Sequence, residues 1–120
     1  MRKVVPSMHA TDQVNVIIGR LLSGLQETLS TQVQETILFG SYARNEAAED
    51  SDIDVLVLVD LTREKIAEYT WKIGAITSEL LLDYGVLVSP IVENSDFYAS
   101  HTDVLPFFRN IRREGVTINA

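Results

Sequence analysis

Hydrophobic residues recur at intervals of three and four positions near the start of the chain, at Val14, Ile17, Ile18, Leu21, Leu25 and Leu29. This spacing is typical of an amphipathic helix with one buried face. Two strands are predicted next, over residues 33–39 and 53–59. The second strand segment is largely aliphatic and lacks polar alternation, which is typical of a strand covered on both faces. We therefore expect residues 53–59 to lie in the middle of a sheet.

A second long helix is predicted to begin after Thr62, which suits an N-cap, and to end at Gly85, which suits the left-handed stop position. Trp71 lies in this segment and is expected to pack against the core, rather than to serve as a platform for a ligand. The buried stripe of the helix is predicted to contain Ile66, Tyr69, Ile73, Ile76 and Leu80.

Residues 86–92 predict a third strand at the edge of the sheet, because Pro90 cannot donate a ladder hydrogen bond. A last helix is predicted over residues 103–113 and a short strand over residues 116–118. This order of elements indicates an α/β or α+β fold, in which helices and a small mixed sheet form two layers. With 120 residues, the chain is expected to form a single domain over residues 1–120.

The composition excludes several classes of function. The formal net charge is −7, and nonspecific nucleic-acid binding requires Lys and Arg, so direct nucleic-acid binding is not expected. The chain has no Cys, which excludes disulfides, thiolate zinc sites and cysteine nucleophiles. Because the sequence has neither an apolar leader nor a run long enough to span a bilayer, we expect a cytoplasmic protein without a membrane segment.

A glycine and a serine follow the first predicted strand, at Gly40 and Ser41. Gly lacks Cβ and allows a sharp turn, and a helical turn that follows it directs free backbone N–H groups at an anion. A phosphate group suits such a turn.

Two aspartates, Asp52 and Asp54, lie two positions apart at the start of the second strand. Residues at this spacing project from the same face of a strand, while Ile53 faces the opposite layer. Two adjacent carboxylates repel each other unless a hard cation such as Mg²⁺ neutralises them. The pair is therefore a candidate metal site.

The two features together resemble the GS and DxD signature of the minimal nucleotidyltransferases in the DNA polymerase beta superfamily. Ten residues separate Gly40-Ser41 from Asp52-Ile53-Asp54, and the surrounding Gly-Ser-Tyr-Ala-Arg and Ser-Asp-Ile-Asp-Val-Leu-Val segments extend the likeness. Either feature alone is common, so their combination at this spacing carries the resemblance. It implies a polymerase beta-like fold in which the Gly-Ser turn binds ATP or another nucleoside triphosphate, and the two aspartates bind Mg²⁺ or Mn²⁺.

The resemblance also assigns Arg44 to nucleotide binding, while an ion pair with Glu46 or Glu49 is an equal alternative. In related enzymes that transfer nucleotides, a further Asp lies on the strand after the second helix. Ser89 and Pro90 occupy the corresponding positions here.

Glu93 is the candidate to replace that missing carboxylate by reaching back along the strand. Asp83 and Asp96 are weaker candidates. For all three residues the alternative is an ordinary acid that faces solvent.

The resemblance implies an enzyme that transfers a nucleoside monophosphate, AMP from ATP, to an acceptor hydroxyl, with Asp52, Asp54 and Glu93 as its catalytic candidates. Family members often occur beside helical HEPN proteins in toxin–antitoxin pairs, so a helical partner is expected to supply the acceptor. The alternative is a catalytically inactive module that binds, neutralises or scaffolds such a partner. Homodimer formation stays open.

Overall fold

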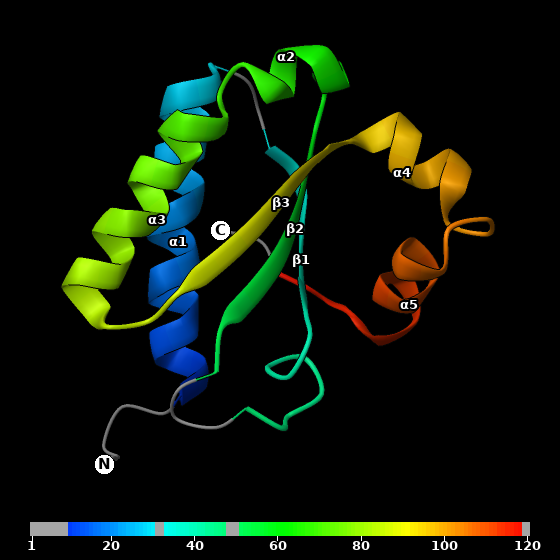
Figure 1. The fold of residues 1–120 in the computed structure, drawn as a ribbon. Helices are drawn as coiled ribbons and strands as arrows, with labels where there is room; N and C mark the ends of the chain where they lie inside the picture. Colours follow the sequence, from blue (N-terminus) through cyan, green and yellow to red (C-terminus); the bar gives the residue numbers. More distant parts are fainter. Residues whose placement is uncertain (1–9, 31–32, 48–50, 119–120) are drawn as a thin grey trace.

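The computed structural model describes residues 10–30, 33–47 and 51–118. It contains a mixed four-stranded sheet with helices on both faces (Figure 1). This architecture confirms the predicted α/β class with a small mixed sheet. The elements in chain order are α1 (Ala10–Leu29), β1 (Val33–Phe39), β2 (Ile53–Val59), α2 (Arg63–Ala67), α3 (Thr70–Tyr84), β3 (Val88–Asn94), α4 (Ser95–His101), α5 (Pro106–Glu114) and β4 (Val116–Thr117).

The strands follow the order β3-β2-β1-β4 across the sheet. β1 pairs antiparallel with β2 and with β4, whereas β2 and β3 are parallel. The central position predicted for β2 is therefore confirmed. β3 lies at the edge, as predicted from Pro90, which cannot donate a ladder bond on that strand.

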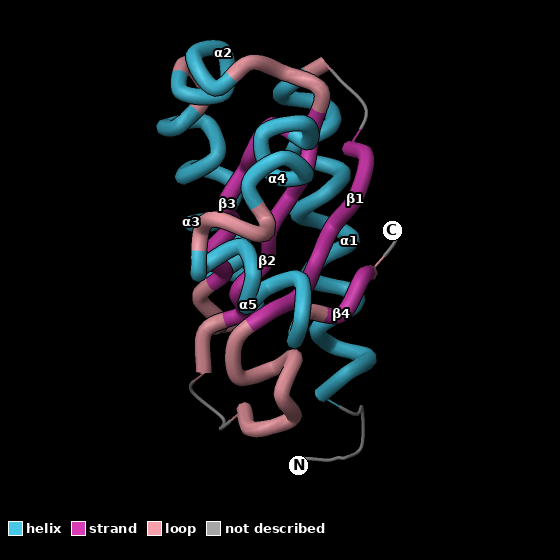
Figure 2. The backbone as a smooth tube through the Cα atoms, turned by 90° about the vertical axis from the view of Figure 1, so that its right-hand side faces the viewer, coloured by secondary structure: helices cyan, strands magenta, loops and turns pink. Residues whose placement is uncertain are grey.

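Alternate side chains of β2 enter two separate hydrophobic clusters. Ile53, Val55, Val57 and Val59 pack with α1 and α3, while Leu56 and Leu58 pack with α4 and α5. Figure 2 shows α4 and α5 on the near side of the sheet, with α1 and α3 behind it. The sheet is thus a middle layer, and the expectation of only two layers was wrong.

The second helical layer consists of α4 and α5, and α4 is a helix that the sequence analysis overlooked. The side chain of Asn94 caps α4 by accepting a hydrogen bond from the Phe97 N–H at 2.8 Å. Asp96 lies in the first turn, where an acidic side chain is favourable. Its short length gives α4 too few residues for a clear hydrophobic period, although the Asn cap and the first-turn acid were readable signals.

The second long helix of the prediction is divided into α2 and α3. Thr62 does cap α2, since its side chain accepts a hydrogen bond from the Lys65 N–H at 3.1 Å. The backbone then tightens, because Glu68 donates to the Lys65 carbonyl in a three-residue bond. Gly85 ends α3 in the left-handed conformation, with φ of 70°, as predicted.

The predicted burial of α3 is confirmed on one face and wrong at Trp71. Leu80 is buried, and Ile73 and Ile76 pack partly buried against the core. Trp71 is instead 73% exposed, because it lies on the face of α3 that points away from α1 and the sheet. None of the helices in the described residues has the length and apolarity needed to cross a bilayer.

Candidate active site

A single helical turn follows β1 at residues 40–45. Gly40 has φ of 77°, and its carbonyl accepts a hydrogen bond from the Arg44 N–H at 3.1 Å. The turn ends at Asn45, which has φ of 59°. The Glu46 N–H donates a hydrogen bond to the Ser41 carbonyl at 2.8 Å, which is typical of a helical turn that ends in a left-handed residue. The predicted turn is therefore present, and Asn45 ends it in the left-handed conformation, which Asn tolerates better than most residues.

The start of this turn leaves backbone donors available. Among the described residues, the N–H groups of Ser41, Tyr42 and Ala43 donate no hydrogen bond. First-turn donors of this kind attract anions, because their partial positive charges point in one direction. The Tyr42 ring packs partly buried against the α1 side of the core, and burial raises the pKa of its hydroxyl. The turn is thus anchored by its ring while its donors are free for an anion.

The turn and the aspartates meet at the same end of the sheet. Asp54 is the β2 residue paired with Phe39, so Gly40 comes directly after the residue opposite Asp54. A Cβ atom at Gly40 would collide with the Asp54 carboxylate. Glycine is thus required here both for its positive φ and for the close approach of this side chain. Ile53 is fully buried on the other face, as the alternation predicted.

The carboxylates of Asp52 and Asp54 are not neutralised within the described residues. The pKa of Asp54 is raised, first by partial burial and then by the negative charge of Asp52, while Arg44 acts in the opposite direction. Asp52 is exposed at the entrance to β2. An oxygen-only donor pair of this kind fits Mg²⁺, which usually takes one or two carboxylates and completes its shell with water and phosphate oxygens. Within the described parts of the chain, no group of three or more His, Cys, Asp or Glu could hold a metal, so Asp52 and Asp54 form a pair without a third such ligand.

Arg44 extends from the turn toward two acidic residues. Its Nε lies 2.8 Å from Glu46 Oε1, and its Nη1 lies 3.8 Å from Glu114 Oε1. The hydrogen bond to Glu46 raises the pKa of Arg44. The predicted pair with Glu46 is confirmed, while Glu49 lies outside the described residues. Glu114, at the end of α5, was not predicted, since no local pattern connects it with the turn.

The position beside Asp54 on β3 is occupied by Ser89. The parallel register pairs Asp54 directly with Ser89, so the strand that carries the third carboxylate in related enzymes presents a hydroxyl here. Asp83 lies on α3, where it pairs with Arg20 at 2.7 Å, and Asp96 lies on α4. Neither residue is part of β3.

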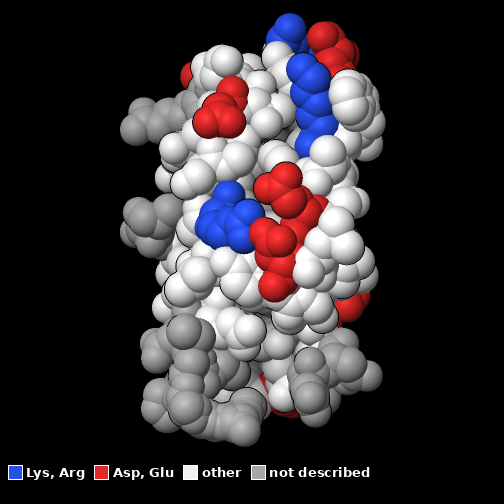
Figure 3. All heavy atoms as spheres, turned by 90° about the vertical axis from the view of Figure 1, so that its left-hand side faces the viewer, with Lys and Arg blue, Asp and Glu red and all other residues white. Residues whose placement is uncertain are grey.

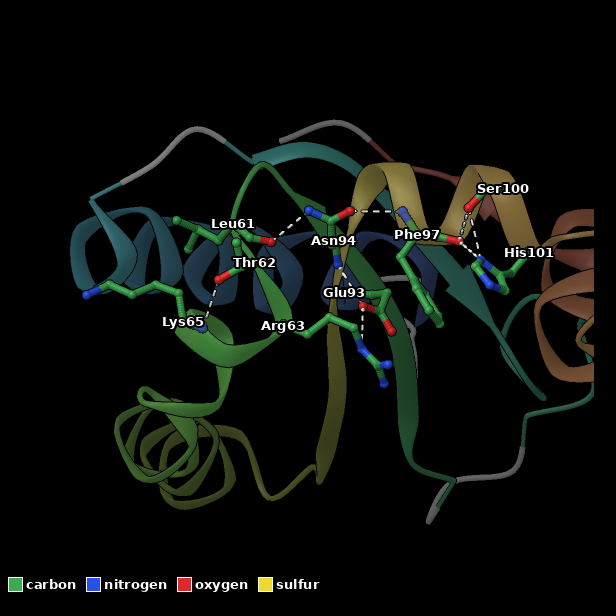
Figure 4. A network of polar contacts seen from close by, with 9 residues as sticks. All are labelled: Leu61, Thr62, Arg63, Lys65, Glu93, Asn94, Phe97, Ser100 and His101. Carbon is green, nitrogen blue, oxygen red and sulfur yellow. Dashed lines mark hydrogen bonds and ion pairs between the residues drawn. The ribbon is translucent and has the colours of Figure 1, made fainter.

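Glu93 lies at the opposite end of the strand pair from Asp54. It is paired with Leu58, four residues along β2 from Asp54, a distance of about 13 Å along the strand. Figure 4 shows its carboxylate directed at the Arg63 side chain and the Asn94 backbone. Glu93 Oε2 accepts from the Asn94 N–H at 2.9 Å and lies 3.5 Å from Arg63 Nε.

Both alternatives predicted for Glu93, a replacement for the third carboxylate and a solvent-facing acid, are wrong. The residue does not reach back to the aspartates, because its side chain is held at the far end of β3. It is also not a solvent-facing acid, since only 7% of it is exposed. Its hydrogen bond with the Asn94 N–H fixes the carboxylate at the end of β3, and its ion pair with Arg63 links that end to the start of α2.

A family model described as nucleotidyltransferase domain matches residues 18–112, a range that contains the turn, both aspartates and β3. The chain belongs to the nucleotidyltransferase domain family. Two curated relatives of this nucleotidyltransferase come from Methanocaldococcus jannaschii. "Putative protein adenylyltransferase MJ0604" is 32% identical over 98 residues, covering 82% of this chain and 90% of the relative. "Putative protein adenylyltransferase MJ0141" is 37% identical over 90 residues, covering 72% and 86%.

A solved structure also shares the fold of this nucleotidyltransferase. It is titled "Crystal structure of the toxin-antitoxin with AMP-PNP" and superposes with a TM-score of 0.56 at 23% sequence identity. The superposition covers 86% of this chain and 70% of the other. At this identity, the likeness concerns the fold.

Proposed function

We propose that this nucleotidyltransferase domain is a metal-dependent enzyme that transfers AMP from ATP to an acceptor hydroxyl on a partner protein. The observation that carries the proposal is the contact between Gly40 and Asp54. It places a turn whose first N–H groups donate no hydrogen bond within the described residues against a carboxylate that none of those residues neutralises. A triphosphate and a divalent cation together supply the two charges that this site lacks.

Each group has a defined role in the proposed reaction. The amides of Ser41 and its two successors, with the Ser41 hydroxyl, bind phosphate oxygens. Asp52 and Asp54 hold Mg²⁺ or Mn²⁺, whose chemistry is to neutralise the charge that develops on the departing pyrophosphate. Arg44 adds positive charge beside the turn. The acceptor oxygen attacks the α-phosphorus in line, the bond between that phosphorus and the pyrophosphate oxygen breaks, and the proton of the acceptor hydroxyl passes to solvent.

The choice of acceptor rests on the relatives. Two of them are named as protein adenylyltransferases, and a structural neighbour is titled as a toxin–antitoxin with AMP-PNP. We therefore propose ATP as the donor and a helical, HEPN-type toxin as the partner that carries the acceptor hydroxyl, with this chain as the antitoxin in the cytoplasm.

A second candidate function is favoured by Ser89. Because Ser89 replaces a carboxylate directly beside Asp54, the chain has no base at that position for the incoming hydroxyl. The alternative is a module that retains nucleotide and metal binding and neutralises its partner by contact alone.

Transfer of labelled AMP from α-labelled ATP to a co-purified partner separates these two functions. The enzyme predicts incorporation that Asp52→Asn and Asp54→Asn abolish and that Glu93→Gln leaves intact in the folded protein. Glu93→Gln is a matched control, because it removes a carboxylate charge from the same face of the sheet. Tight partner binding without incorporation, with activity appearing only in Ser89→Asp, would establish the binding module instead.

A further inference from the structure

The outward face of α3 carries uncharged side chains that are left in solvent. Trp71 is 73% exposed and Leu82 is 85% exposed. These two residues are eleven positions apart, so they lie on one face of the helix and about 17 Å apart along its axis. Small or apolar residues fill the interval. We call this surface the outer α3 stripe, and it consists of Trp71, Gly74, Ala75, Ser78, Leu81 and Leu82.

The opposite face of α3 packs against α1 and the core. Ile76 packs so closely on α1 that a Cβ at Gly24 would lie 3.2 Å from it. In contrast, a Cβ at Gly74 would meet nothing within 4 Å. A helix that is apolar on both faces is normally covered on both faces. An uncovered apolar stripe of this kind is typical of an interaction surface.

Charged residues border one flank of the stripe in a fixed order. Lys72 lies near the start of α3, and Glu79 and Asp83 follow on the same flank, seven and eleven positions later. Arg20 of α1 contacts both acids, at 3.5 Å and 2.7 Å. Figure 3 shows the side of the molecule that carries α1 and α3, where basic and acidic side chains gather next to uncharged surface. Arg20 balances one of the two negative charges, so the flank is basic toward the start of α3 and carries a net negative charge toward its end.

We propose that the outer α3 stripe binds a second copy of this chain, with the two α3 helices antiparallel. A two-fold axis perpendicular to the helices keeps both charged flanks on the same side and reverses their direction. Lys72 of each copy then faces Glu79 of the other, and Trp71 of each copy meets Leu82 of the other. The small residues in the middle of the stripe allow the two helices to approach closely. In this arrangement the stripe of one copy packs on the stripe of the other, and their charged flanks are complementary.

The proposed dimer is independent of the proposed nucleotidyl transfer. α3 packs on the face of the sheet that carries Ile53, whereas Asp54 projects from the other face. Dimer formation therefore leaves the turn and the aspartates of both copies accessible, and a test of association does not depend on activity.

Sedimentation equilibrium over a concentration series tests this interface directly, with Trp71 as an internal reporter. Trp71 is the only tryptophan in the sequence, so its emission reports the stripe alone. We expect the mass to double from 13.4 kDa and the emission maximum to shift to shorter wavelength over the same concentration range. A mass of 13.4 kDa at every concentration up to roughly 1 mM would overturn the proposal, as would association that requires a different protein.

Charge reversal distinguishes a self-complementary pair from any other contact. Lys72→Glu and Glu79→Lys are each expected to weaken the dimer at least about tenfold, and the double variant is expected to restore it. Arg109→Glu is the matched control, because it makes the same charge change on α5, which packs on the opposite face of the sheet from α3. Dimer formation that survives both single changes, or a double variant that stays monomeric, would contradict the antiparallel arrangement.

Discussion

Two carboxylates on the same face of the sheet, Asp54 and Glu93, have opposite surroundings. Glu93 is almost fully buried, yet it accepts the Asn94 N–H and lies 3.5 Å from Arg63. Asp54 is only partly buried, and its carboxylate accepts no hydrogen bond from any described residue. Its pKa is raised by its own desolvation and by Asp52.

The difference separates a carboxylate that stabilises the fold from one that is available for a ligand. A buried acid with partners contributes to stability, and its removal leaves other polar groups unsatisfied. An acid held near a like charge without a cation costs stability, and such groups concentrate at functional sites. Position in the sequence alone did not distinguish the two residues.

The largest expected effect is the loss of AMP transfer when the Asp54 carboxylate is replaced. Asp54→Asn should lower AMP transfer at least about 100-fold, because it removes half of the proposed metal ligand pair. Initial rates of incorporation, compared with Glu93→Gln at equal concentrations of folded protein, measure this effect. An Asp54→Asn variant as active as Glu93→Gln would remove the distinction between the two acids.

Gly40→Ala should cost about 1–3 kcal/mol of unfolding free energy and also abolish nucleotide binding. The new Cβ has to occupy a positive φ and displaces the Asp54 carboxylate. Gly85→Ala is the matched control, since Gly85 has φ of 70° but nothing within 4 Å of an added Cβ. Denaturation should show a loss of about 1 kcal/mol in Gly85→Ala, with nucleotide affinity unchanged. Equal effects of both changes on affinity would contradict a specific contact at Gly40.

Glu93→Ala should lower the free energy of unfolding by about 1–3 kcal/mol, because the Asn94 N–H and Arg63 lose their acceptor. Glu93→Gln retains an acceptor oxygen and should cost less. Urea denaturation of both variants measures the difference. A Glu93→Ala protein as stable as the unmodified chain would mean that this network does not hold β3 and α2 together.

The smallest expected effect is the dependence of stability on pH at Asp54. Because its pKa is raised in the folded state, the folded protein holds this proton at pH values where the unfolded chain has released it. The contribution of Asp54 to stability therefore falls as the pH rises from its ordinary pKa through its raised pKa. Without metal, Asp54→Asn should therefore stabilise the protein slightly at neutral pH, because it removes a carboxylate that is partly desolvated and close to Asp52. Thermal unfolding in EDTA tests whether Asp54→Asn is the more stable of the two proteins. In saturating Mg²⁺ the unmodified protein should instead be the more stable one.

The sequence predicted the parts of the site that local patterns determine. β1, β2 and the glycine turn between them follow from strand propensity and from the conformational freedom of Gly40. The close approach of Gly40 and Asp54 agrees with the spacing of the motifs, since a turn and a short connection return the chain to an antiparallel neighbour.

The remaining features depend on contacts between distant segments. The exposure of Trp71 was missed because α3 is apolar on both faces, so periodicity does not indicate which face is buried. Glu93 was misplaced because its partner, Arg63, lies thirty residues earlier in the chain. The pairing of Asp54 with Ser89 depends on the β2–β3 register, and the sequence indicated it only through the resemblance to related enzymes.

Paramagnetic line broadening by Mn²⁺ tests the central claim most directly, that the metal binds between the glycine turn and Asp54. ¹⁵N-labelled protein with a non-hydrolysable ATP analogue would be titrated with Mn²⁺ at low stoichiometry. The account predicts that the backbone amide signals of Ser41 and Asp54 broaden first, while that of Asn94 stays sharp. Broadening that begins at Asn94, or that spreads evenly over the acidic surface, would contradict it.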